Sequence, residues 1–252
     1  ANRTVHWGSN ADSVPVYNGV VVTEDNLLVI DDIARNLQLY RRLDGKLMST
    51  SHRLESRPNG VCLISKTKVA VCLVNSTIVI LSFKWIDDVK LVKTFNVNTG
   101  FNYCHSVAKW NPDKLIVSGV KWDDGYMFYW CVVNLADGRV DSTHKVCQGN
   151  LSHLAIKNDT VYISCRTLYS TVRDVYAYDI FNPHTPKFLY QRRGFRPDSI
   201  MVDERNFIYV CDRNSNSIHQ LTDSGQLVTI HTMSSDPYGI FYDDQHGVLY
   251  TT

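Results

Sequence analysis

The chain has 252 residues, of which 44% are hydrophobic and 20% charged, so it can build a sizeable core and is not an intrinsically disordered protein. Its 26 basic and 25 acidic residues give a net charge of +1, so any basic nucleic-acid-binding face must come from local segregation of charge. No apolar run approaches the ~18 residues that a transmembrane helix needs, and we expect no membrane partner.

Strand patterns run through the whole chain, whereas helix patterns are nearly absent. Short runs rich in Val, Ile, Leu and Tyr alternate with clusters of Asp, Asn, Gly and Ser, and no amphipathic stripe lasts three helical turns. The runs form six similar units, each with a small position just ahead of its first apolar run. In chain order this position falls at Gly19, Gly60, Ser106, His153, Ser199 and Gly239. Consecutive small positions lie roughly 40 to 47 residues apart, a period typical of propeller blades.

The sequence therefore predicts an all-β fold, a six-bladed β-propeller of four-stranded antiparallel blades in a single domain. The expected blades cover residues 14–54, 55–99, 100–146, 147–193, 194–233 and 234–252. The last unit supplies only two clear strands, at 238–242 and 247–251, and residues 1–13 hold one short strand without a repeat. Because a blade cannot bury both faces of its sheet alone, the ring must close, and we expect residues 1–13 to complete the last blade.

Over residues 197–218 the fifth unit carries Pro-x-Ser-Ile, then an Asp in the following turn, then Ile-Tyr-Val-x-Asp, followed by Asn214, Asn216 and Ile218. "RPNGV" at 57–61 and "DPYGI" at 236–240 match its start. This pattern resembles the NHL repeat, most specifically in units two, five and six. The resemblance implies the C-terminal domain of a tripartite-motif ubiquitin ligase, which recognises protein or RNA targets. It also implies a longer parent protein, whose ligase motifs and oligomerisation would reside in other segments.

Propeller geometry predicts where a ligand would bind. The loop entering the first strand of each blade and the loop between its second and third strands open on one face, around the mouth of the central channel. The residues that we expect there, basic and aromatic side chains with a few polar neighbours, are Arg35, Arg57, Asn59, Tyr103, His105, Lys121, Trp122, Arg166, Tyr169, Arg173, Arg196, Asp198, Arg213 and Tyr238.

This mixture of residues suits two kinds of ligand. Arginine and aromatic side chains are common anchors at protein interfaces, and they also pair with phosphates and stack on bases. We therefore predict a non-catalytic recognition module that binds a protein, with RNA on the same face as the alternative and no DNA partner. Aspartates in the same loops, such as Asp31, Asp32, Asp123 and Asp124, offset much of the positive charge.

A metal-dependent propeller hydrolase or lyase is the lesser alternative. His105 and His153 are expected near the mouth with Cys104 and Asp198, but a zinc site needs three or four converging ligands. A calcium lactonase would need a converging Glu, and none occupies an entry position. We therefore predict no catalytic residue, no metal, no cofactor and no enzyme activity for this domain.

The seven cysteines show no CxxC spacing, and most lie inside apolar runs. This pattern favours buried free thiols in a reducing compartment, so we expect a cytoplasmic protein.

Overall fold

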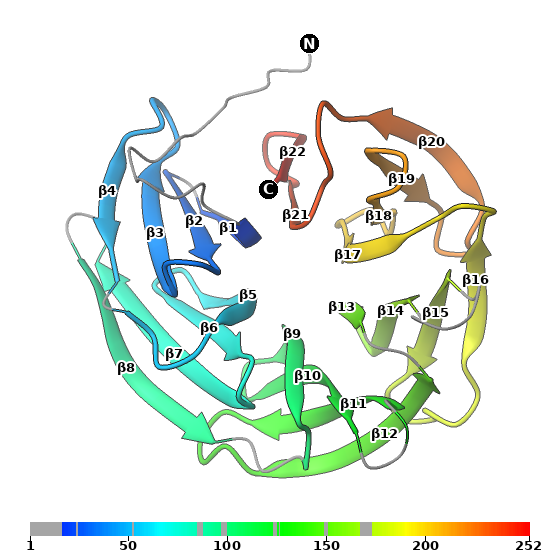
Figure 1. The fold of residues 1–252 in the computed structure, drawn as a ribbon, viewed down its shortest axis with the longest axis horizontal. Coiled ribbons are helices and arrows are strands. Elements are labelled where there is room, and N and C mark those ends of the chain that lie inside the picture. Colours follow the sequence, from blue (N-terminus) through cyan, green and yellow to red (C-terminus); the bar gives the residue numbers. More distant parts are fainter. Residues whose placement is uncertain are drawn as a thin grey trace.

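The computed structural model describes residues 17–252 apart from 24, 52, 85–87, 97–99, 123–124, 126, 149–150 and 167–172. In this part of the chain all regular structure is β-strand, and no helix is long and apolar enough to cross a membrane. The strands form five four-stranded antiparallel sheets and one two-stranded sheet. Figure 1 shows these sheets arranged in a ring, with the first strand of each one innermost.

Each four-stranded sheet is a meander in which consecutive strands pair. Blade 1 comprises β1 (Tyr17–Val22), β2 (Asn26–Asp31), β3 (Asn36–Arg41) and β4 (Leu47–Thr50). Blade 2 comprises β5 (Pro58–Ser65), β6 (Lys68–Leu73), β7 (Thr77–Lys84) and β8 (Asp88–Asn96). Blade 3 comprises β9 (Tyr103–Asn111), β10 (Lys114–Lys121), β11 (Met127–Asn134) and β12 (Val140–Gln148).

Blade 4 comprises β13 (Leu151–Lys157), β14 (Thr160–Arg166), β15 (Arg173–Asp179) and β16 (Lys187–Gln191). Blade 5 comprises β17 (Pro197–Val202), β18 (Ile208–Asp212), β19 (Ser217–Leu221) and β20 (Leu227–Thr232). The sixth unit comprises only β21 (Ile240–Asp243) and β22 (Val248–Thr251).

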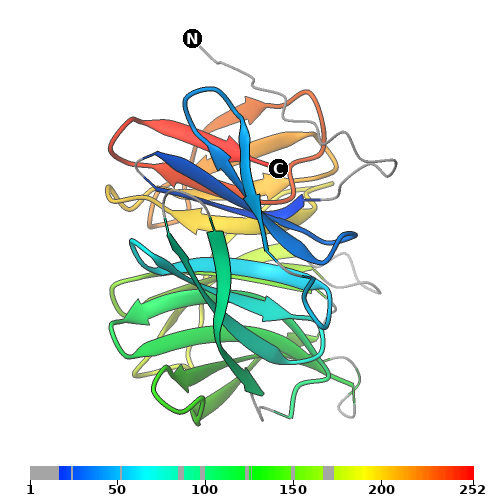
Figure 2. The ribbon, with the colours of Figure 1, turned by 90° about the vertical axis from the view of Figure 1, so that its left-hand side faces the viewer.

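The hydrophobic core is divided among the interfaces between consecutive units. The second strands are almost continuously apolar, because both faces of a central strand are covered by neighbouring blades. Thus Val69 and Val71 of β6 pack against blade 1, whereas Ala70 and Cys72 of the same strand pack against blade 3. Figure 2 shows the successive sheets from the side, each twisted relative to the next.

The small position of each unit is explained by the close approach of innermost strands. A Cβ atom added at Gly60 would lie 2.8 Å from Ser106 Cα, and one added at Gly239 would lie 2.9 Å from Gly19 Cα. At Gly60 and Gly239 the small position of one unit therefore contacts the small position of the next, and backbone atoms leave no room for a larger side chain.

The ring closes through β21, which contacts both β17 and β1. The prediction of six four-stranded blades is corrected in this respect: the described residues form five such blades, and the sixth unit contributes two strands. The sixth unit has two strands because the sequence after the fifth blade contains only two strand-forming runs, which become β21 and β22. The closing segment predicted at 1–13 lies outside the described residues.

Candidate functional site

The entry loops and the loops between second and third strands lie at the same end of the ring, as the pairing register requires. In blade 5, for example, Pro197 at the start of β17 pairs with Asp212 at the end of β18, and Asp212 pairs with Ser217 at the start of β19. We call this end of the ring the channel mouth. The predicted site residues divide there into two clusters.

The first cluster joins blades 4, 5 and 6, and we call it the blade 4–6 cluster. His153 Nε2 lies 3.0 Å from Asp198 Oδ1, and Arg213 Nη1 lies 3.2 Å from Asp198 Oδ2. Arg213 also donates a hydrogen bond to the Tyr238 hydroxyl, and its guanidinium carbon lies 3.7 Å from the centre of that ring. Blades 4 and 5 thus meet at one carboxylate, and Arg213 links it to Tyr238 of the sixth unit.

Electrostatics keep this carboxylate ionised. Burial by itself would raise the pKa of Asp198, but the hydrogen bond from His153 and the charges of His153, Arg213 and Arg166 outweigh it, so the pKa is lowered. Arg166 is in the opposite situation. Burial, together with the charges of Arg196, Arg213 and Arg173, lowers the pKa of Arg166 to about 10, against an opposing effect of Asp198.

The second cluster joins blades 1, 2 and 3. Arg57 makes a two-pronged ion pair with Asp32, in which Nε lies 2.7 Å from Oδ1. Asn59 donates a hydrogen bond to the Cys104 carbonyl at 3.1 Å and lies 3.2 Å from His105 Nδ1. These side chains are engaged with one another, so this cluster holds the blades together rather than offering free polar groups.

The remaining predicted residues make other contacts. The Tyr103 ring stacks on His105 with centroids 4.6 Å apart. Lys121 Nζ lies 5.0 Å from the Tyr129 ring centre, and Trp122 is 52% exposed. Arg35 occupies a β2–β3 turn with a φ of 55°. In blade 4, Arg173 Nη1 donates to the Phe195 carbonyl at 3.3 Å. In blade 5, the Arg196 backbone N–H donates to Asp212 at 2.8 Å. Tyr169 lies outside the described residues.

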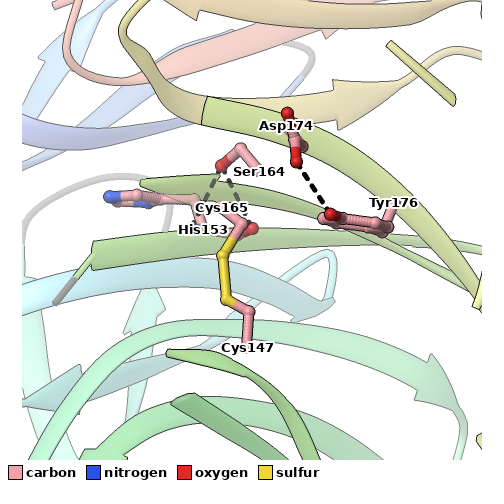
Figure 3. The surroundings of a disulfide bond; sticks show 6 residues. All are labelled: Cys147, His153, Ser164, Cys165, Asp174 and Tyr176. Atoms are coloured by element: carbon pink, nitrogen blue, oxygen red, sulfur yellow. Dashed lines mark hydrogen bonds between the residues drawn. A yellow bond between two sulfur atoms is a disulfide. The ribbon is translucent and has the colours of Figure 1, made fainter. Parts of the chain in front are cut away.

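His153 is the residue of the cluster that the predicted site set omits. It occupies the small position of its unit, where the other units have Gly or Ser. A large polar side chain at a position that otherwise excludes side chains was a sign in the sequence that this position has another role. Ser164 Oγ of β14 hydrogen-bonds the His153 carbonyl at 3.3 Å (Figure 3). It also hydrogen-bonds the Asp198 carbonyl, so it connects β13 to β17.

The donor set does not fit a metal ion. Among the residues that the structure describes, no group of three or more His, Cys, Asp or Glu side chains converges on one point. His105 and His153 have different partners, Asn59 and Asp198 respectively.

One disulfide corrects the prediction that the cysteines are free thiols. Cys147, at the end of β12, is bonded to Cys165 of β14, and the bond links blade 3 to blade 4 (Figure 3). Disulfides persist mainly in oxidising compartments, so this disulfide does not support the predicted cytoplasmic location, which stays a prediction.

Two of the free cysteines are poorly suited to act as nucleophiles. Burial raises the pKa of the Cys62 and Cys104 thiols to about 12, so they stay protonated at neutral pH.

A cavity of about 530 Å³ lies at the opposite end of the ring. It is bounded by the turns between first and second strands, and its charged lining residues are Asp25, Arg42, Lys66, Glu204, Asp243 and Asp244. Arg42 pairs with Asp243 there at 2.6 Å. No residue of the predicted site lines this cavity.

Comparison with known proteins identifies the fold of this chain but does not assign it to a family. No protein-family model matches the sequence, and no curated protein matches it, so the resemblance to NHL repeats and tripartite-motif ligases stays a prediction. A luciferin-regenerating enzyme structure is similar with a TM-score of 0.70 and 15% identity, covering 94% of this chain and 83% of its own. A gluconolactonase from Xanthomonas campestris has a TM-score of 0.67 and 14% identity, covering 95% and 85%.

A third solved structure is an inactive variant of virginiamycin B lyase from Staphylococcus aureus with quinupristin, at a TM-score of 0.65 and 12% identity, covering 90% and 74%. These structures contradict the prediction that the domain is not an enzyme, because proteins named as a lactonase and a lyase share its fold over nearly its whole length. At such identities the likeness establishes the architecture alone, and the chain is a β-propeller.

Proposed function

We propose that this propeller is an enzyme of the hydrolase or lyase class, with its reaction centre in the blade 4–6 cluster and His153 as the proton-transferring group. The observation that carries the proposal is the 3.0 Å contact between His153 Nε2 and Asp198 Oδ1. A carboxylate on one imidazole nitrogen holds the other as the basic nitrogen and stabilises the imidazolium that forms when it accepts a proton. The names of the fold neighbours support the same reaction classes.

The arrangement suits proton transfer to and from an oxygen-bearing substrate. With Nε2 donating to Asp198, Nδ1 is left to take a proton from water in a hydrolysis, or from a C–H group next to a carbonyl in an elimination. The same proton then passes to the leaving oxygen. Positive charge from the neighbouring arginines would stabilise the oxyanion or enolate that develops in between.

His153→Asn tests the proposal, because asparagine keeps a polar group but cannot exchange the proton. The substrates are a panel of aldonolactones and aryl esters, together with carboxylate esters whose elimination creates an absorbing double bond. We expect kcat to fall about 10²–10⁴-fold on the substrate that the wild-type protein turns over. His231→Asn, on the exposed strand β20, is the matched control and should leave kcat unchanged. Equal turnover by wild type and His153→Asn on every substrate of the panel would overturn the proposal.

Recognition of a protein on the channel-mouth face is the second candidate, with RNA as its alternative partner. Trp122, 52% exposed next to Lys121, favours it, since exposed tryptophan is a typical interface anchor. It would suit the substrate-binding domain of a tripartite-motif-type ligase. A protein partner captured by the wild-type domain should survive nuclease and be lost with Trp122→Ala. An RNA partner should instead be lost with Arg57→Glu plus Arg196→Glu and weaken steeply with salt.

A further inference from the structure

Four arginines from two neighbouring blades gather beside the proposed reaction centre. Arg166 and Arg173 are paired residues of β14 and β15 in blade 4, and Arg196 and Arg213 come from the loops of blade 5. The charges of the other three act on Arg166 and disfavour its charged form. The positive charges of these three arginines therefore make it costly to keep Arg166 charged.

The arginines also carry hydrogen-bond donors without acceptors. Arg166 is only 7% exposed, and within the described part of the chain its Nε and Nη1 atoms have no hydrogen-bond partner. The same holds for the buried Nε atoms of Arg173 and Arg213. Buried donors are nearly always paired in native proteins, and a charged one is especially costly to leave unpaired. Four such donors at one place indicate that an acceptor belongs there.

The neighbouring carboxylates do not supply that acceptor. Both oxygens of Asp198 are engaged, one by His153 and the other by Arg213. Asp212 accepts hydrogen bonds from the Arg196 backbone and the Ser215 hydroxyl. Asp236 is 3.8 Å from Arg213 and about half exposed. Asp174, next to Arg173 in the chain, accepts a hydrogen bond from the Tyr176 hydroxyl, and its buried Oδ1 atom has no hydrogen-bond partner among the described residues either. The charges that act on Arg166 are those of Asp198 and of three arginines, so positive charge is in excess around Arg166.

We infer that Arg166, Arg173, Arg196 and Arg213 form a binding site for an oxyanion group, a carboxylate or a phosphate ester, carried by the ligand of the channel mouth. This inference rests on the proposed function only in taking the mouth as the substrate site. Such a group offers several acceptor oxygens at once and removes both the unpaired donors and the mutual repulsion. His153 lies on the other side of Asp198, so a bound anion would be held next to the proton-transferring group.

The test is a titration of the wild-type protein with sodium phosphate and, separately, with sodium succinate, at constant ionic strength against sodium chloride. We expect at least one of the two anions to raise Tm, on the order of 5 °C when its concentration is ~100 Kd. A rise with succinate alone assigns a carboxylate, and a rise with phosphate alone assigns a phosphate ester. No rise with either anion overturns the inference without any variant being needed.

Arg166→Gln should weaken the binding at least ~10-fold by calorimetry, since it removes the most buried free donors. Arg173→Gln is a second variant in case the first does not fold. Arg139→Gln, an exposed arginine of the β11–β12 turn at the other end of the ring, removes the same charge and should bind as wild type. Wild-type affinity in both Arg166→Gln and Arg173→Gln would overturn the inference.

The two proposals fail separately. His153→Asn should keep anion binding while losing turnover. Anion binding in a protein whose turnover ignores His153 would overturn the proposed function and keep the oxyanion site. If turnover depends on His153 but the protein binds neither anion, the oxyanion site is overturned and the proposed function is kept.

Discussion

Asp198 at the start of β17 and Arg213 after β18 form an ion pair in which Nη1 lies 3.2 Å from Oδ2, and both side chains are largely buried. The other oxygen of the carboxylate is held by His153 from the preceding blade. A single side chain thus connects the proposed proton-transferring group to a cluster of cations. We therefore expect Asp198 to matter both for the stability of the protein and for the proposed reaction.

Asp198→Asn is expected to lower the free energy of unfolding by about 3–5 kcal/mol at pH 7, because it leaves buried cations without their counter-charge. The measurement is urea unfolding of both proteins. Asp236→Asn, which removes a carboxylate that is about half exposed, is the control and should cost less than about 1 kcal/mol. A loss below about 0.5 kcal/mol in Asp198→Asn would contradict the prediction.

The same residue predicts a pH dependence. The pKa of Asp198 is lowered in the folded protein, so its contribution is complete above the unfolded value of about 3.9 and disappears as pH falls through the folded value. The difference in unfolding free energy between wild type and Asp198→Asn should therefore be constant from pH 7 to about pH 5 and shrink below pH 4. A difference that grows on acidification would show that the carboxylate is not stabilised in its charged form.

The disulfide between Cys147 and Cys165 should stabilise the protein by about 3 kcal/mol, given the 18-residue separation that it spans. Denatured protein without reductant should show five reactive thiols, from Cys62, Cys72, Cys104, Cys131 and Cys211. Reduction should expose the remaining two of the seven cysteines and lower Tm. Cys147→Ser should lower Tm as reduction does and make it insensitive to reductant, whereas Cys62→Ser should stay sensitive. Seven reactive thiols before reduction would rule the bond out.

Gly60→Ala is expected to destabilise the fold by about 1–3 kcal/mol, because the new Cβ would lie 2.8 Å from Ser106 Cα, a backbone atom that cannot turn away. Gly19→Ala is the matched comparison. Its Cβ would meet side-chain atoms of Val61 and Ile30 at 3.0 and 3.1 Å, which can adjust, so its cost should be smaller. Thermal unfolding of the two variants side by side checks the order, and a reversed order would contradict the packing explanation.

Asp203 and Glu204 are adjacent acids in the β17–β18 turn with opposite expected sensitivities. Asp203 is fully buried and accepts hydrogen bonds from the Arg205 and Phe207 backbone at 2.9 and 2.8 Å and from the Tyr209 hydroxyl at 3.2 Å. Asp203→Ala should therefore cost roughly 2–4 kcal/mol in unfolding free energy, since several donors lose their acceptor. Glu204→Ala, at an exposed side chain, should cost less than about 1 kcal/mol. Similar losses in the two variants would contradict this difference in burial.

The blades could be predicted from sequence because each is a local meander whose strands alternate with turn residues. The small position at Gly60 or Gly239 was readable for the same reason, because the other units, apart from the fourth with His153, also have Gly or Ser there. The placement of loop residues at one end of the ring followed from register alone. The two-stranded sixth unit was also visible in the chain, but its completion by another segment depends on a contact between distant residues.

Which of the site residues contact one another could not be predicted from the sequence. Arg57 could meet Asp32 or remain free for a ligand, and only the distance between blades 1 and 2 decides. Cys147 and Cys165 occupy different places in their blades, the end of an outer strand and the end of a second strand, so the repeat itself gave no reason to join them. His153 departed from the repeat, and that departure was the one local sign in the sequence of the proposed reaction centre.

The contact between Gly19 and Gly239, where the sixth unit meets the first, joins two residues that are far apart in the sequence. Contacts of such wide separation form late, because the entropy of closing the intervening chain must be overcome first. We expect amide hydrogens of β21 and β22 to exchange fastest among the strands, since this junction opens first. Mechanical or thermal failure of the ring would then begin where the sixth unit meets blade 1, while the contact of Tyr238 with Arg213 still holds the sixth unit to blade 5.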